Sequence, residues 1–210
     1  PGKSLEERFP AVLFFRDTLE GHNALSWNPF IHSLVSNGYL VFAPNVRGSS
    51  GQGKDFRQAA FSLGGEIDVR DAFFGLDRLA GDGLIDSESV GVFGAGTGGF
   101  LATAALSRDG SRFQAAVSLG GIVDLATASS YPAMTAWTRY ITGSTPLAAP
   151  EPYYERSLTN FVGALRTPII FLYGGSDPRA PIQQLEQFAV QAEVEGKWFD
   201  YRVFNTEPHG

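Results

Sequence analysis

Three short segments carry residues that could take part in hydrolytic chemistry. A glycine-rich run at residues 94–99 follows an apolar stretch, and Asp177 and His209 each come just after a later apolar stretch. In a catalytic triad a histidine takes a proton from the nucleophile, and an aspartate orients that histidine and stabilises its charged form. Asp177 and His209 carry the side chains that such chemistry needs, but their positions alone do not assign them these roles.

The glycine-rich run has the spacing of a sharp turn from a buried strand into a helix. This is the context of a nucleophile elbow, Gly-x-Ser-x-Gly, whose outer glycines let the strand and the helix approach closely. Gly94 and Gly98 fill the outer positions here, and Gly96 fills the middle position. Thr97, directly after the middle residue, would supply a backbone amide to an oxyanion hole. Gly96 has no side chain with which to attack a substrate.

The elements around these segments alternate between strands and helices. Apolar runs predict strands at residues 11–15, 39–43, 89–93, 115–119, 168–173 and 199–204. Helical spacing of apolar or small residues predicts helices at 27–36, 67–79, 98–106, 134–140 and 182–194. Strands that are apolar throughout and separated by helices imply an α/β fold, with a mostly parallel sheet covered by helices on both faces.

The glycine turn resembles the Gly-Gly-Ser-Tyr-Gly-Gly elbow of the prolyl oligopeptidase family of serine peptidases. Residues 44–53, Pro-Asn-Val-Arg-Gly-Ser-Ser-Gly-Gln-Gly, resemble the family's Pro-Asn-Tyr-Arg-Gly-Ser-x-Gly-x-Gly loop. Residues 83–86 resemble its turn before the elbow strand, and residues 154–157 resemble its Tyr-x-x-Arg-Ser segment. The resemblance extends over nearly the whole chain and implies an α/β-hydrolase fold.

The resemblance also implies roles for single residues. Residues 173–181 resemble the family's His-Gly-x-x-Asp-Asp-Arg-Val-Pro segment, which makes Asp177 the triad acid and Arg179 a substrate contact. Residues 207–210 resemble its Glu-Gly-His-Gly segment, which makes His209 the triad histidine.

The chain departs from the family pattern at two places. Gly96 stands where the family has its nucleophilic serine. Residues 16–21, Arg-Asp-Thr-Leu-Glu-Gly, stand where the family usually has His-Gly-Gly-Pro or a tyrosine-containing equivalent that helps to build the cleft. An oxyanion donor contributes roughly 3–4 kcal/mol to lowering a reaction barrier, so the second departure predicts weakened catalysis independently of the first.

Other interpretations of these residues stay open at this point. The spacing of Gly94, Gly96 and Gly99 also fits a dinucleotide-binding turn, although no acidic residue follows at the expected distance. Thr97 or Ser118 could replace the missing hydroxyl, but both are better explained as structural residues. Asp177 lies in a Ser-Asp-Pro segment that is also good turn chemistry.

The composition excludes several classes of function. The chain has 22 acidic and 16 basic residues, a net charge of −6, and this balance argues against non-specific nucleic-acid binding. It has no cysteine, which excludes disulfides, thiolate catalysis and cysteine-based zinc sites. No run of about 18 apolar residues predicts a membrane span. No cofactor is indicated, and the compartment, cytoplasmic or periplasmic, cannot be read from the sequence.

The 210 residues suit one domain, predicted to be the C-terminal part of a longer chain and truncated at both ends of the α/β-hydrolase fold. The leading hypothesis is a peptidase-like domain that has lost activity and serves in binding or assembly, with a vestigial triad of Asp177 and His209. One alternative is a serine peptidase or esterase whose nucleophile was substituted at Gly96. Another is a structural domain packed on a β-propeller. A peptide or such a propeller domain is the expected partner.

Overall fold

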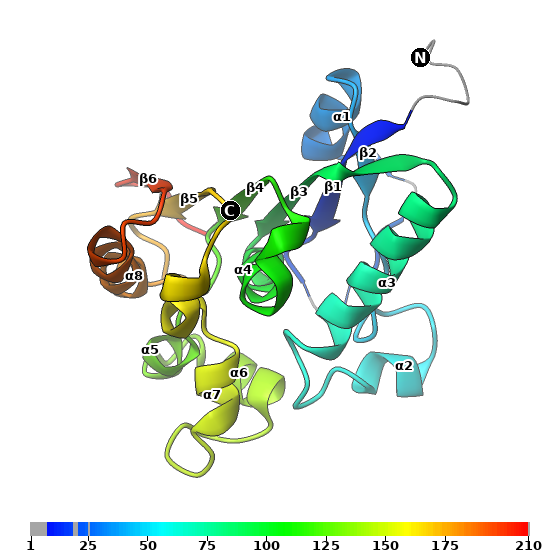
Figure 1. Cartoon of the computed structure of the whole chain (residues 1–210). Helices are drawn as coiled ribbons and strands as arrows, with labels where there is room; N and C mark the ends of the chain where they lie inside the picture. The colour runs from blue at the N-terminus through cyan, green and yellow to red at the C-terminus, as the bar shows by residue number, and fades with distance from the viewer. Residues whose placement is uncertain (1–7, 19–20, 25, 210) are drawn as a thin grey trace.

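A six-stranded parallel sheet forms the centre of the computed structural model, which describes residues 8–18, 21–24 and 26–209 (Figure 1). The strands are β1 (Phe9–Phe15), β2 (Leu40–Phe42), β3 (Ile85–Ala95), β4 (Ala115–Leu119), β5 (Ile169–Gly174) and β6 (Phe199–Phe204). Their order is β2-β1-β3-β4-β5-β6, and every neighbouring pair is parallel. This is the predicted α/β-hydrolase arrangement, in which side chains after parallel strands meet at one edge of the sheet.

Helices cover the two faces of the sheet unequally. They are α1 (Pro29–Ser36), α2 (Lys54–Gln58), α3 (Ile67–Gly81), α4 (Thr97–Asp109), α5 (Leu125–Ser129), α6 (Thr135–Thr142), α7 (Glu151–Glu155) and α8 (Ile182–Val194), with short 3₁₀ helices at Gly110–Arg112 and Leu158–Ala164. Figure 1 shows α1 on one face, and α3, α4 and α8 on the other. Phe30 of α1 contacts Phe93, whereas Phe188 of α8 packs on Phe171. The three short helices α5, α6 and α7 lie between β4 and β5 in sequence.

The sequence predicted the long elements well and missed the short ones. The predicted strands at 115–119 and 199–204 and the helix at 182–194 have the predicted bounds. The predicted helix at 27–36 begins at Pro29, because the side chain of Asn28 accepts hydrogen bonds from the amides of Phe30 and Ile31 and so caps the helix there. The helices α2, α5 and α7 were not predicted, because five residues do not complete two helical turns.

The predicted strand at 89–93 is longer in the structure. It begins at Ile85 and ends at Ala95, directly before the glycine turn.

Within the described part of the chain, no helix is both long and apolar enough to cross a membrane.

Candidate active site

The turn between β3 and α4 is held by glycines in close contact with the backbone. A Cβ atom on Gly94 would overlap the carbonyl group of Gly98, and a Cβ atom on Gly98 would overlap the carbonyl oxygen of Phe15. Gly96, at the middle of the turn, has φ 51° and ψ −116°, in the region that side chains rarely adopt and glycine adopts freely. Its amide donates to the carbonyl oxygen of Leu119 in the neighbouring strand. Strand and helix are thus fixed at a sharp angle around Gly96.

Asp177 and His209 come together at the ends of β5 and β6. Nδ1 of His209 lies 2.5 Å from Oδ2 of Asp177, and the Asp177 side chain is buried. The other carboxylate oxygen of Asp177 accepts hydrogen bonds from the amides of Arg179 and Ala180. The aspartate is therefore fixed by the turn after β5, and Nε2 of His209 is left to face the cleft.

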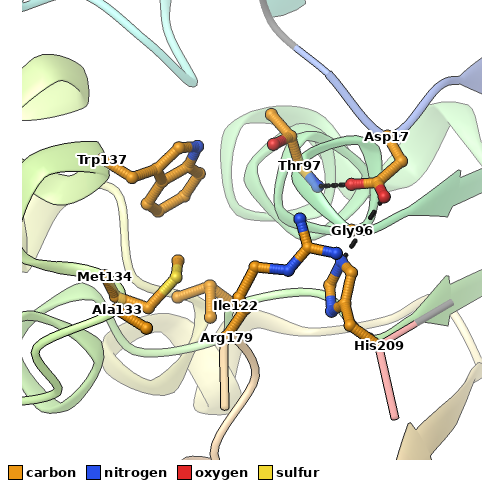
Figure 2. A pocket seen from close by; sticks show the side chains of 10 residues that line it. Asp17, Gly96, Thr97, Ile122, Ala133, Met134, Trp137, Arg179 and His209 are labelled. Carbon is orange, nitrogen blue, oxygen red and sulfur yellow. Dashed lines mark hydrogen bonds and ion pairs between the residues drawn. The ribbon is translucent and has the colours of Figure 1, made fainter. Parts of the chain in front are cut away.

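A second carboxylate, that of Asp17, lies on the other side of His209. Asp17 comes two residues after β1, and its Oδ2 lies 3.4 Å from Nε2 of His209 (Figure 2). Its Oδ1 accepts a hydrogen bond of 3.0 Å from the amide of Thr97. The same carboxylate occupies the space into which a side chain on Gly96 would extend.

The two carboxylates determine the electrostatics of the cleft. The hydrogen bond with Asp17 raises the pKa of His209, burial lowers it, and the hydrogen bond with Asp177 raises it again, so that the net pKa lies above the ordinary histidine value. Partial burial raises the pKa of Asp17, but His209 and the Thr97 amide outweigh burial, and the net pKa is lowered. The site therefore favours an imidazolium between two carboxylates.

A cavity of about 100 Å³ opens beside this cluster. One wall carries Asp17, Gly96 and His209, and the other wall is apolar and includes Met134 and Trp137 (Figure 2). Arg179, from the turn after β5, also lines the cavity. Among the described residues, its exposed guanidinium has no ion pair or hydrogen-bond partner.

The remaining sequence candidates have structural contacts. Ser118 is fully buried and donates to the carbonyl oxygen of Gly99, so its hydroxyl faces the helix rather than the cleft. Arg47, in the loop at residues 44–53, forms an ion pair with Asp71 at 2.5 Å. Asp68 accepts hydrogen bonds from the amides of Gly65 and Val69.

The contribution of Asp17 was not foreseen from the sequence. In the sequence, residues 16–21 stand out only for the oxyanion donors that they lack. The one local signal was an acidic residue just after a buried strand, at the edge where the other site residues were expected. Leu19, Glu20 and Gly210, which belong to the segments compared above, lie outside the described residues.

With this geometry in place, comparison with known proteins identifies the family. A model of the prolyl oligopeptidase family matches residues 23–210. The chain belongs to the prolyl oligopeptidase family. This membership agrees with the motif resemblance and with the parallel sheet described above.

Several known proteins match the chain over most of its length. Acylamino-acid-releasing enzyme 2 of Oryza sativa subsp. japonica is 25% identical over 210 residues, which cover 95% of this chain and 27% of that enzyme. A solved structure of a Mycobacterium tuberculosis puromycin-hydrolyzing peptidase matches with a TM-score of 0.91 at 27% identity. The match covers 97% of this chain and 31% of the chain of that peptidase. A Pyrococcus horikoshii acylaminoacyl peptidase, at 24% identity and a TM-score of 0.91, has the same fold and covers 100% of this chain and 34% of its own. The chain thus spans 27% and 31% of the first two of these relatives.

Proposed function

We propose that this prolyl oligopeptidase-family domain binds peptide-like ligands in its cleft and does not hydrolyse them by serine chemistry. The observation that carries the proposal is Gly96, which takes the middle of the strand-to-helix turn beside His209 and brings no nucleophile there. The Asp177–His209 pair alone can hold or move a proton at Nε2. Without a triad nucleophile, only the residual effects of binding and oxyanion stabilisation remain.

The walls of the cavity support a ligand that has both an apolar part and an anionic part. Met134 and Trp137 offer apolar contact, and Trp137 also stacks edge-on against the buried ring of Phe100, which fixes its orientation. The unpaired guanidinium of Arg179 would bind a carboxylate. A peptide-like acid with a small apolar side chain has both features.

The alternative of an active serine hydrolase substituted only at position 96 is less well supported. Serine at that position would meet the Asp17 carboxylate. Activity after a single exchange at position 96 would therefore require the Asp17 side chain to turn out of that space. The β-propeller interface stays a prediction, which the chain's 31% share of a longer relative makes reasonable.

Activity-based labelling tests the hydrolytic half of the proposal. A fluorophosphonate probe reacts only with an activated serine, so the unchanged chain should remain unlabelled while a reference serine hydrolase in the same tube is labelled. Hydrolysis of p-nitrophenyl acetate should not exceed that of the His209→Gln variant. Labelling of any serine, located by peptide mass spectrometry, would overturn the proposal.

Calorimetry with N-acetylleucine and its uncharged amide tests the binding half. We expect the acid to bind more tightly than the amide by about tenfold, the effect of one charge-assisted contact. Arg179→Gln should abolish this preference, whereas Arg202→Gln, a matched change at an exposed arginine of β6, should keep it. Equal binding of the acid and the amide, or no binding of either, would contradict the assignment of the cleft.

A further inference from the structure

One carboxylate contacts each of the three groups that a serine reaction would use. The Asp17 side chain fills the space above Gly96, its Oδ1 accepts from the Thr97 amide at 3.0 Å, and its Oδ2 lies 3.4 Å from Nε2 of His209. Figure 2 shows the contacts with Thr97 and His209 as two dashed lines, one at each carboxylate oxygen of Asp17. A contact with only one of the three groups would be an ordinary surface interaction, but the combination places Asp17 at the centre of the site.

The backbone holds Asp17 in this position. β1 pairs with β3 in a register that sets Phe15 opposite Gly94. Gly98, at the start of α4, lies so close to the carbonyl oxygens of Phe15 and Arg16 that any larger residue would overlap them. The chain leaving β1 is therefore pressed against the first turn of α4, and the side chain of residue 17 reaches the glycine turn.

The charges around His209 favour a carboxylate at the position of Asp17. Asp177 faces Nδ1 from the turn after β5, and Asp17 faces Nε2 from the end of β1. Arg179, also from the β5 turn, adds a favourable charge near Asp17. The imidazolium contacts both carboxylates, and Arg179 adds its charge without forming an ion pair with either of them. A neutral histidine could donate to only one of the two carboxylates, whereas an imidazolium donates to both.

We propose that Asp17 is an internal carboxylate ligand of this site, which fills with its own side chain the two adjoining positions that a serine side chain and a substrate oxyanion would take. This inference concerns the same site as the proposed function and rests on Gly96 as the nucleophile position. In it, Gly96 and Asp17 form a matched pair, because the glycine provides the space that the carboxylate uses. Restoring serine alone leaves the oxyanion donor of Thr97 and the base nitrogen of His209 engaged.

Labelling kinetics of three variants test the occupancy directly. Gly96→Ser, Asp17→Gly and the double variant are treated with a fluorophosphonate, after circular dichroism has shown that each is folded. The double variant should be labelled at the introduced serine at least about 100-fold faster than Gly96→Ser, the size of a general-base contribution. Equal rates in the two serine variants, including no labelling of either, would overturn the inference. Labelling of the unchanged chain would instead overturn the proposed function.

A second measurement does not depend on a new serine. The imidazole of His209 is followed by NMR over a pH series in the unchanged chain, in Asp17→Gly and in Asp55→Asn, a control at an exposed residue of α2. The midpoint should fall in Asp17→Gly only, and added acetate should raise it again in that variant while leaving the unchanged chain unaffected. An unchanged midpoint in Asp17→Gly, or an equal acetate effect in both proteins, would contradict an internal carboxylate ligand.

Discussion

The carboxylate of Asp177 and the imidazole of His209 are joined across the ends of two neighbouring strands, with Nδ1 and Oδ2 2.5 Å apart. Two amides of the same turn donate to the Asp177 carboxylate and hold it in place. The carboxylate in turn sets the position of the His209 ring. This contact therefore links the last residues of the described chain to β5. His209 contributes to stability as well as to the cleft, and the pH dependence of stability is expected to reveal it.

Stability should fall at alkaline pH through His209. Its folded pKa lies above the unfolded value of about 6.5, so its stabilising contribution is complete below about pH 6.5 and is lost as the pH rises through the folded pKa. Urea unfolding of the unchanged chain and of His209→Gln, measured from about pH 6 to about pH 9, should give a difference in free energy of unfolding that shrinks as the pH rises. A difference that stays constant over this range would rule out the expected imidazolium.

Buried Asp68 should destabilise the domain as it ionises. Burial raises its pKa from 3.8 to about 6, so the folded state holds the proton more tightly than the unfolded chain does. The contribution of Asp68 to stability is then greatest below about pH 4, and about 3 kcal/mol of it is lost as the pH rises to about 6.5. Relative to Asp68→Asn, the unchanged chain should lose this amount over that range in denaturant titrations. A parallel pH profile of the two proteins would show that Asp68 keeps its ordinary pKa.

Gly94 should be intolerant of any side chain. Because its Cβ would overlap the Gly98 carbonyl group, Gly94→Ala should cost about 3 kcal/mol of stability through overpacking. Gly91→Ala, in the same strand, is the matched control. The nearest atom to its Cβ would be the carbonyl oxygen of Ala115 at 3.5 Å, an ordinary contact, and the change should lie within about 0.5 kcal/mol. Similar losses in the two variants, measured by urea unfolding, would mean that the turn can relax.

The hydroxyl of Tyr173, and not only its ring, should contribute to the stability of the domain. The side chain is fully buried, and its hydroxyl donates to the carbonyl oxygen of Gly121. Tyr173→Phe leaves that oxygen without this donor and should cost about 1–2 kcal/mol. Tyr201→Phe, at an exposed position of β6, should change stability by less than about 0.5 kcal/mol. Thermal unfolding of the two variants compares them, and equal melting temperatures would contradict the role of the hydroxyl.

The sequence predicted those parts of the fold that depend on local patterns. Runs such as residues 115–119 are apolar, bounded by polar residues and confined to one element, so their ends are visible in the sequence. The true start of α1 depends on a side-chain cap by Asn28, and the extension of β3 to Ile85 depends on pairing with β1. Neither pairing nor capping changes the apolar pattern, and so these bounds were missed.

The candidate site was predicted only in part, for a similar reason. The order of the glycine turn, Asp177 and His209 along the chain suggested that they would meet, and the structure brings Gly96, His209 and Arg179 to one cavity, with Asp177 behind the histidine. Asp17 meets the Thr97 amide across 80 residues of sequence. That contact arises from the register of β1 on β3, which no local pattern encodes. The chemical roles of the candidate site residues stay predictions.

Because the Asp17 carboxylate takes the space beside Gly96, the effect of a substitution at either position depends on the residue at the other. With the carboxylate in its present position, a serine introduced at position 96 would overlap Asp17 until that side chain turned away. Removal of Asp17 alone exposes an empty cleft and restores no nucleophile. Since neither change alone provides an unobstructed nucleophile, serine activity at this site is expected to need both changes together.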